Sequence, residues 1–278
     1  MKNILYYGNC QLGAIQKLIQ NSNLKGRYII CHQTKINEKN FLRIIKKSNI
    51  IIMTLVSENY REKKYLSSKF ILENARKNTK IIILPSFYFD YYYIDLKYIK
   101  NEKGEKIGTP IDYHHEFIID SYKNNITIEN VIKDYIENEN LLSLKELEDK
   151  KNNSLNELKE RELEGSKKYQ NIRHYFFISS HDFILKNYKD ILLFYSMNHP
   201  TKYFFQYICK KILKILNLPE KINMNIDPLS KTKCILYHCI QKGVSFSIKD
   251  NQPLIKEKRN IKDIINLYYS SYERLNLK

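Results

Sequence analysis

Four consecutive residues near the start of the chain combine side chains that could carry out nucleophilic chemistry. Gly8, Asn9, Cys10 and Gln11 follow the apolar run Ile4–Tyr7. We predict that this run is a buried strand and that Gly8 permits a tight turn with close backbone approach. Cys10 would then lie at the start of a helix, where N–H groups and the helix dipole favour a thiolate. Asn9 and the neighbouring N–H groups could donate hydrogen bonds to a developing oxyanion. The alternative interpretation is a turn glycine beside a buried thiol.

A cysteine nucleophile commonly works with a histidine base, and the chain offers seven histidines. His199 is the best placed, because Pro200 favours the first turn of a helix and sets His199 at its N-terminal edge. Asn198 is not expected to orient His199, since adjacent side chains usually point apart. The sequence identifies no carboxylate for that task, and a structural role for His199 stays open. The other histidines lack such a position: His32, His114, His115, His174, His181 and His238.

Polar side chains follow two later apolar runs and could line the same pocket. Ser86 follows Pro85 after the fourth predicted strand, and Ser57 follows the third. Arg61 and the lysines near it could contact phosphate groups, although a solvated charged loop is the simpler explanation. The sequence contains no glycine-rich phosphate loop and no cluster of metal-ligating residues.

Alternating strands and helices must hold these residues in place. The first third of the chain shows short, uninterrupted apolar runs separated by segments with helical spacing, which indicates a parallel sheet with helices on both faces. In such sheets, ligands bind beyond the carboxyl ends of the strands, where Cys10, Ser57 and Ser86 are expected. We therefore predict an α/β core with the nucleophile turn over residues 1–126. The predicted strands are residues 3–7, 28–31, 49–55 and 80–84.

The rest of the chain is predicted to be mainly helical. Residues 127–170 carry a narrow apolar stripe among many charges, which predicts a helical insertion or cap, either one broken helix or a hairpin. Residues 171–278 would form a mainly helical C-terminal part that completes the active site. Within it, Ile184–Met197 and the amphipathic stretch after Pro200 are expected to be helices.

The composition favours a reduced, globular, cytoplasmic protein. Of the 278 residues, 43% are hydrophobic, which allows a buried core. The five cysteines are odd in number and lack Cys-x-x-Cys spacing, which argues against a disulfide framework and a zinc site. We find no signal-peptide pattern and no run of about 20 apolar residues. The net charge of +17 invites a nucleic-acid interpretation, but the lysines are scattered, so we predict no nucleic-acid partner.

Several of these motifs together resemble the WcbI family of polysaccharide biosynthesis acetyltransferases. The resemblance rests on residues 8–11 after the first strand, on Pro85-Ser86 with the aromatic segment beyond it, and on residues 198–201 before an amphipathic helix. The chain is also distantly similar to the SGNH/GDSL hydrolases, whose nucleophile follows the first strand of a flavodoxin-like sheet. Those enzymes place an aspartate three residues before the histidine, whereas this chain has Ser196 there.

The resemblance implies that the protein binds coenzyme A and transfers an acetyl group from acetyl-CoA to a hydroxyl of a capsular sugar or polysaccharide, without a metal. Carried over by position, Cys10 takes the place of the nucleophile and His199 that of the base, with Asn9 as a further catalytic candidate. Aromatic residues from Phe87 to Tyr98 would stack on the sugar. The residues expected to contact the coenzyme are Gly8, Gln11, Ser57, Arg61, Ser86 and Asn198.

Several alternatives stay open at this point. His199 could activate Cys10 for an acyl-enzyme step, or it could deprotonate the sugar hydroxyl directly. An SGNH-like esterase or deacetylase would use the same site with water in place of the sugar. A binding protein for anionic polymers would use bulk charge alone. A homo-oligomer is compatible with the sequence.

Overall fold

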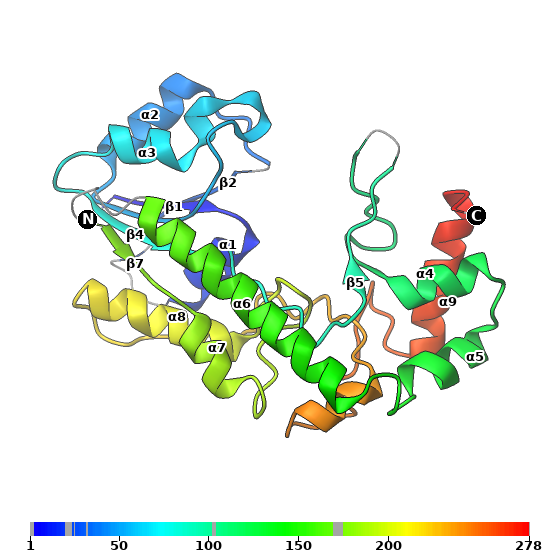
Figure 1. The fold of residues 1–278 in the computed structure, drawn as a ribbon. Helices are drawn as coiled ribbons and strands as arrows, with labels where there is room; N and C mark the ends of the chain where they lie inside the picture. The colour runs from blue at the N-terminus through cyan, green and yellow to red at the C-terminus, as the bar shows by residue number, and fades with distance from the viewer. Residues whose placement is uncertain are drawn as a thin grey trace. The chain divides into compact units, whose positions relative to one another are not determined.

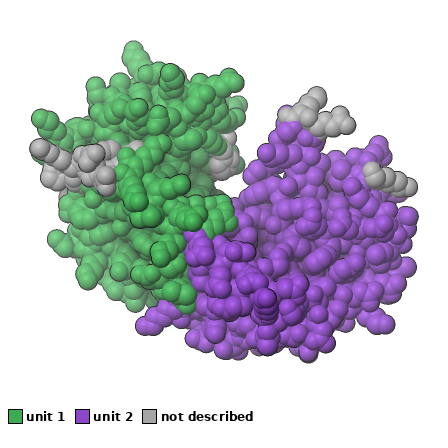
Figure 2. All heavy atoms as spheres, viewed as in Figure 1, with its two compact units in different colours: residues 1–87, 157–185, 200–228 green, residues 88–156, 186–199, 229–278 purple. Residues whose placement is uncertain are grey.

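The structure is a computed structural model that describes residues 3–19, 24, 26–31, 33–101, 104–168 and 175–277. The chain divides into two compact units, each assembled from three separate stretches (Figure 2). Unit 1 comprises residues 1–87, 157–185 and 200–228, and unit 2 comprises residues 88–156, 186–199 and 229–278. The assignment of roles to residues 1–126, 127–170 and 171–278 stays a prediction.

The core of unit 1 is a five-stranded sheet in which all strands are parallel, in the order β2-β1-β3-β4-β7 (Figure 1). This is the order of flavodoxin-like sheets, with β2 and β1 on one side of the point where the order reverses and β3, β4 and β7 on the other. The predicted α/β class with a flavodoxin-like parallel sheet is confirmed. The strands are β1 (Ile4–Gly8), β2 (Arg27–Ile30), β3 (Ile50–Thr54), β4 (Lys80–Leu84) and β7 (Tyr175–Phe177).

Alternate side chains of these strands build an apolar layer on each face of the sheet, because neighbouring residues of a strand point to opposite faces. One face is covered by α2 (Glu38–Lys47) and α3 (Ser68–Asn74) (Figure 1). Its buried cluster combines residues of the strands with residues of both helices: Leu5, Tyr7, Ile51, Met53, Ile81, Ile83, Phe41, Ile45 and Ile71. This layer fixes the sheet beneath the turn at Gly8.

The other face is covered by α1 (Cys10–Leu18) and α8 (Lys202–Ile215), which contact each other. Tyr6 is fully buried on this face and donates a hydrogen bond to the Leu24 carbonyl at 3.0 Å. Helix α8 begins after its N-cap Thr201, so Pro200 precedes the helix instead of occupying its first turn. The buried stripe of α8 is the predicted amphipathic one: Phe204, Phe205, Ile208, Cys209, Ile212 and Leu213.

The predicted helical stretch 127–170 forms two helical segments separated by residues 137–143. The first is α5 (Ile128–Val131), which continues as a π-helical turn over Ile132–Ile136. The second is α6 (Leu144–Lys168), which belongs to unit 2 up to residue 156 and to unit 1 from residue 157.

The C-terminal half of α6 supports the start of α7 (His181–Asn187) in unit 1. Glu162 is buried, and its carboxylate accepts hydrogen bonds from the backbone N–H and the hydroxyl of Ser180 at 2.8 and 2.6 Å. A carboxylate at this place satisfies N–H groups that a helix start leaves without intrahelical partners. Glu162, a charged residue on the buried side of α6, thus has a structural role.

Unit 2 is built mainly from aromatic residues and short elements. The short strands β5 (Leu96–Lys97) and β6 (His114–His115) pair antiparallel. Helix α4 (Glu116–Lys123) contacts both α5 and α9 (Ile261–Arg274). The largest buried side chains of this unit are Phe89, Tyr92, Phe194, Tyr237, Tyr268 and Tyr272.

The helix predicted over Ile184–Met197 is wrong beyond Asn187. Residues 188–197 are irregular but mostly buried, and their backbone groups bond to other irregular segments. The N–H of Phe89 donates to Met197 O at 2.8 Å, and the N–H of Cys234 donates to Tyr195 O at 2.8 Å. A continuous apolar run fits any buried backbone whose polar groups find partners, so periodicity alone could not exclude this conformation.

Among the described residues, no helix combines the length and the apolar character needed to cross a membrane.

Candidate active site

The turn between β1 and α1 depends on a glycine at its first position. The φ angle of Gly8 is 157°, and a Cβ atom there would lie 2.2 Å from Thr54 Oγ1 and 3.2 Å from Thr54 N. Thr54 ends the neighbouring strand β3, so the close approach of two strand ends excludes a side chain at Gly8. The predicted tight turn is present, and steric contact with β3 explains its glycine.

Asn9 caps the helix that follows this turn. Its Oδ1 accepts a hydrogen bond from Gln11 N at 3.0 Å, as N-cap residues typically do. Its Nδ2 donates to Ser86 Oγ at 3.3 Å. The carboxyl ends of β1 and β4 therefore bring two of the predicted site residues together.

Gln11 ties the turn to the loop after β4 and is itself almost fully buried. Its Nε2 donates to Phe87 O at 2.8 Å, and its Oε1 accepts from Phe87 N at 3.1 Å. Both polar ends of the amide are thus bonded to the backbone of one residue. The structure supports a positioning role for Gln11, while its expected contact with a coenzyme stays a prediction.

Cys10 is the first residue of α1, and its side chain is exposed, whereas the other four cysteines are buried. Burial raises the pKa of the Cys209, Cys234 and Cys239 thiols, to about 11 for Cys239. The first turn of α1 contains no acidic residue that would oppose a negative charge on sulfur. Cys10 therefore has the accessibility and the helix position expected of a nucleophile, and the buried-thiol alternative is wrong for it.

Tyr28 on β2 is a neighbour of this turn that the sequence did not indicate. Its hydroxyl donates to the Asn9 carbonyl at 2.8 Å. Burial, followed by the nearby Cys10 sulfur, raises the pKa of Tyr28 to about 12. The phenol therefore stays protonated at neutral pH and keeps its hydrogen bond to the turn.

Ser57 and Arg61 lie in the loop after β3, at the same edge of the sheet, and both are exposed. Arg61 has a φ of 53° inside a short 3₁₀ turn. Ser86 is hydrogen-bonded to Asn9 of the turn, while the expected roles of Ser57 and Arg61 stay predictions.

Asn198 and His199 belong to unit 2, where a row of hydroxyl groups contacts them. Asn198 Nδ2 donates to Tyr98 Oη at 2.9 Å, and Asn198 Oδ1 accepts from Tyr113 Oη at 2.5 Å. Tyr113 Oη also lies 3.2 Å from His199 Nε2, and the two rings are perpendicular with centroids 5.5 Å apart. Adjacent residues thus share one partner, the hydroxyl of Tyr113.

The imidazole of His199 is largely buried and neutral at physiological pH. Burial lowers the pKa of His199 to about 4, and Asp112 opposes this shift only in part. In the described part of the chain, Nδ1 of His199 is buried without a hydrogen-bond partner. Ser196, at the position of the aspartate in SGNH enzymes, is fully buried and donates toward Asn198 Oδ1 at 3.5 Å. His199 consequently lacks the orienting carboxylate of a hydrolase triad.

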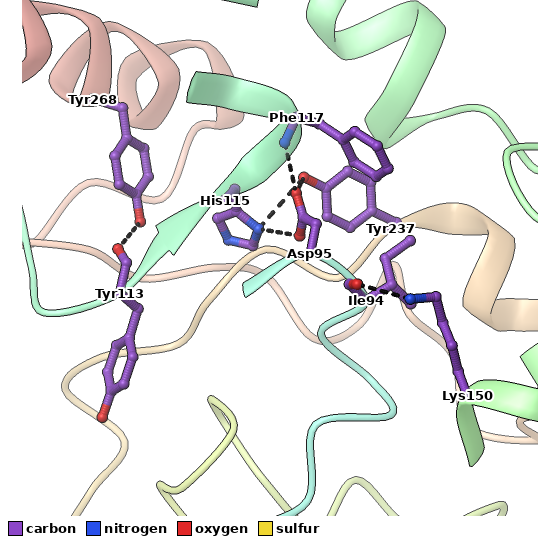
Figure 3. Close-up of polar contacts among 8 residues, drawn as sticks. All are labelled: Ile94, Asp95, Tyr113, His115, Phe117, Lys150, Tyr237 and Tyr268. Atoms are coloured by element: carbon purple, nitrogen blue, oxygen red, sulfur yellow. Dashed lines mark hydrogen bonds and ion pairs between the residues drawn. The ribbon is translucent and has the colours of Figure 1, made fainter. Parts of the chain in front are cut away.

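His115 is the histidine that does pair with a carboxylate, but the pair is enclosed. His115 Nδ1 lies 2.8 Å from Asp95 Oδ1, and Tyr237 Oη donates to Asp95 Oδ2 at 2.6 Å (Figure 3). The backbone N–H of Phe117 donates to the same carboxylate at 3.2 Å. His115 has no exposed surface, so this network holds β5 and β6 together and is not open to a substrate.

The aromatic segment expected to stack on a sugar is mostly core. Phe87 is buried in unit 1, and Phe89 and Tyr91 to Tyr93 are buried in unit 2. Tyr92 Oη donates to Tyr188 O at 2.7 Å, and Tyr93 Oη donates to Phe194 O at 2.8 Å. The expectation of sugar stacking is therefore wrong for these rings, because they pack against one another and satisfy backbone carbonyls. Tyr88 and Tyr98 are partly exposed.

Two further histidines have other contacts. His114 is buried between Tyr272 Oη and the Ile107 carbonyl, at 3.1 and 2.8 Å. His181 lies beside the exposed Asp182 at the start of α7. His32 and His174 lie outside the described residues. In the part of the chain that the structure describes, no group of three or more histidine, cysteine or acidic side chains could hold a metal ion.

Unit 1 presents the exposed Cys10 thiol at the start of a helix. The side-chain amide of Asn9, which precedes it, is hydrogen-bonded to the hydroxyl of Ser86. Unit 2 presents a neutral imidazole held by a phenol. A thiol, hydrogen-bond donors and an imidazole are the groups that acyl transfer requires.

Comparisons with known proteins point to one family. The family model described as "Polysaccharide biosynthesis enzyme WcbI" matches residues 3–221. A solved structure of WcbI superposes with a TM-score of 0.77 and 21% sequence identity, covering 98% of this chain and 90% of that one. That structure is described as the native protein without a disulfide bond between coenzyme A and one of its cysteines. No curated protein matches the sequence.

Proposed function

Because the chain belongs to the WcbI family of polysaccharide biosynthesis enzymes, we propose that it is an O-acetyltransferase that moves an acetyl group from acetyl-CoA to a sugar hydroxyl. The observation that carries the proposal is the exposed thiol of Cys10 at the first residue of α1. Coenzyme A as the donor is supported by the description of the similar WcbI structure, which names that molecule together with a cysteine.

The proposed reaction has two steps. In the first, Cys10 Sγ bonds to the thioester carbonyl carbon and the bond to the coenzyme A sulfur breaks. His199 takes the thiol proton and returns it to the departing coenzyme A thiolate. In the second, the sugar hydroxyl oxygen bonds to the acetyl carbon and the bond to Cys10 Sγ breaks, while the hydroxyl proton passes through His199 to the sulfur. Direct attack of the sugar on acetyl-CoA, with His199 as base, is the variant without a covalent intermediate.

Asn9 and Ser86 are proposed to stabilise the negative oxygen of each tetrahedral intermediate. The Asn9 amide N–H and the Ser86 hydroxyl lie 3.3 Å apart at the carboxyl end of the sheet, beside Cys10. Donors fixed before the reaction stabilise developing charge more than mobile water does. Gly8, Ser57, Arg61 and Asn198 are proposed as further contacts of the coenzyme.

Titration with coenzyme A tests this function. We expect coenzyme A to raise the melting temperature of the wild-type protein, and of Cys10→Ser to a similar extent, because most of the ligand's contacts do not involve the sulfur. Only the wild type should then transfer radiolabelled acetyl to a polysaccharide acceptor. No binding up to millimolar coenzyme A would contradict the transferase and would favour an esterase that uses water instead.

A further inference from the structure

In the described part of the chain, no carboxylate is hydrogen-bonded to His199, so another group must orient its imidazole. Within the described residues, Nδ1 is buried without a partner, and Nε2 lies 3.2 Å from Tyr113 Oη. A catalytic imidazole normally has one nitrogen held by a second group, because that bond fixes both the ring orientation and the tautomer. Tyr113 is the residue in position to do so.

The direction of the hydrogen bonds follows from Asn198. Its Nδ2 donates to Tyr98 Oη at 2.9 Å, so its Oδ1 is the atom that faces Tyr113. Tyr113 donates its hydroxyl proton to that oxygen at 2.5 Å. A phenol has a single proton to give, so toward His199 the Tyr113 oxygen can only accept, and Nε2 must carry the hydrogen.

The state of Nδ1 agrees with this assignment. A buried N–H without an acceptor is among the costliest unsatisfied groups, whereas a buried lone pair without a donor is tolerated more often. A proton on Nδ1 would create such an orphaned donor, and a lone pair there does not. Two independent contacts therefore favour the same tautomer, with hydrogen on Nε2.

Tyr113 is also fixed at its backbone. Its carbonyl accepts a hydrogen bond from Tyr268 Oη at 3.1 Å, while its own hydroxyl points away from the buried histidine network (Figure 3). The next two residues form β6, where His114 contacts Tyr272 and His115 contacts Asp95. This anchoring gives the Tyr113 hydroxyl one place relative to His199, which an orienting group needs.

We propose that Tyr113 is the positioning residue of His199: with its proton committed to Asn198, its hydroxyl oxygen accepts the hydrogen bond from Nε2–H and fixes the orientation and the tautomer of the ring. The proposal rests on the proposed role of His199 as a base. It gives the phenol the task of the aspartate in Ser-His-Asp enzymes, at the other ring nitrogen.

The tautomer can be measured without any assay of activity. We would record ¹⁵N shifts of the imidazole nitrogens in protein labelled at histidine, with His199→Gln to assign the signals. The wild type should show a protonated Nε2 and an unprotonated Nδ1 for His199. In Tyr113→Phe, which keeps the ring, the two tautomers should mix. Tyr269→Phe is the matched control, because its hydroxyl bonds to Ile126 O in the same unit, and it should leave the His199 signals unchanged.

Acetyl transfer provides the second readout. Tyr113→Phe should slow transfer about tenfold or more while coenzyme A affinity stays within twofold of the wild type. A wild-type His199 with its proton on Nδ1, or signals that Tyr113→Phe leaves unchanged, would overturn the proposal. If the tautomer is as expected but His199→Gln transfers acetyl normally, the proposed base role fails and the orientation by Tyr113 stands.

Discussion

Individual side chains of this protein owe their chemistry to how far they are buried. The thiol of Cys10 is exposed, whereas burial holds the pKa of Cys239 at about 11 and keeps that thiol protonated. Burial lowers the pKa of His199 instead, because the charged form of a histidine is the protonated one and burial disfavours it. At neutral pH the accessible thiol is therefore the one at the start of α1, and the His199 imidazole is unprotonated.

The depressed pKa of His199 predicts a pH dependence of stability. The folded protein protonates this residue at about pH 4, whereas an unfolded histidine does so at about 6.5. The unfolded state binds more protons between these values, so the contribution of His199 is present above about pH 6.5 and is lost as pH falls toward 4. On lowering the pH from 7 to 4.5, the wild type should lose about 2 kcal/mol more free energy of unfolding than His199→Gln.

Urea unfolding of both proteins at the two pH values measures this difference, and groups common to both cancel. Equal losses of unfolding free energy in the two proteins would contradict the prediction, because they would show that folding does not lower the pKa of His199.

Residue types and spacing predicted some members of the site and missed others for a physical reason. Cys10 and Asn9 were predicted because a strand, a glycine and a helix start lie next to one another in the sequence. Tyr28 and Tyr113 were missed, since their hydroxyls act across long separations and the chain contains 23 tyrosines. Gln11 was predicted as a ligand contact, and its burial against Phe87 became visible only from the fold.

At the level of elements, the turn after β1 and the loop after β4 are held together by one side chain. Gln11 bonds to both polar groups of the Phe87 backbone. Because Phe87 is fully buried, water cannot replace those bonds if the amide is removed. The positions of Asn9 and Ser86 relative to each other depend on this connection.

Removing the Gln11 amide should cost both stability and activity. Gln11→Leu leaves a buried N–H and a buried carbonyl without partners and should lower the free energy of unfolding by about 2–4 kcal/mol. Gln16→Leu on the same helix is the matched control, because that amide is partly buried and makes one bond, to Gly26 O at 2.7 Å. Denaturant unfolding measures both. Equal losses in the two variants would contradict the connecting role of Gln11.

The parallel strands were the part of the fold that the sequence specified best. Four of the five strands were predicted to within one residue at each end, because short apolar runs between turn residues are typical of buried strands. The stretch after Asn187 was predicted as helix because its residues are apolar, but it is a buried irregular segment. Its conformation is determined by bonds to residues 89 and 234, which are distant in the sequence.

For the molecule as a whole, the net charge of +17 is the property that could mislead a functional study. Any strongly basic protein binds anionic polymers through counterion release. We expect weak binding to duplex DNA that falls steeply with salt and is identical for wild type and Cys10→Ala. Fluorescence anisotropy at several salt concentrations measures this. Tight binding at physiological salt that depends on Cys10 would contradict the assignment of the site to acyl transfer.

The central claim is that Cys10 accepts the acetyl group. The most direct test is to mix the protein with acetyl-CoA, without acceptor, quench in acid and measure the intact mass and the modified peptide. We predict one added acetyl group on the peptide containing Cys10, none in Cys10→Ala, and loss of the label when acceptor is added. An acetyl group on another residue, or full transfer activity by a folded Cys10→Ala, would contradict it.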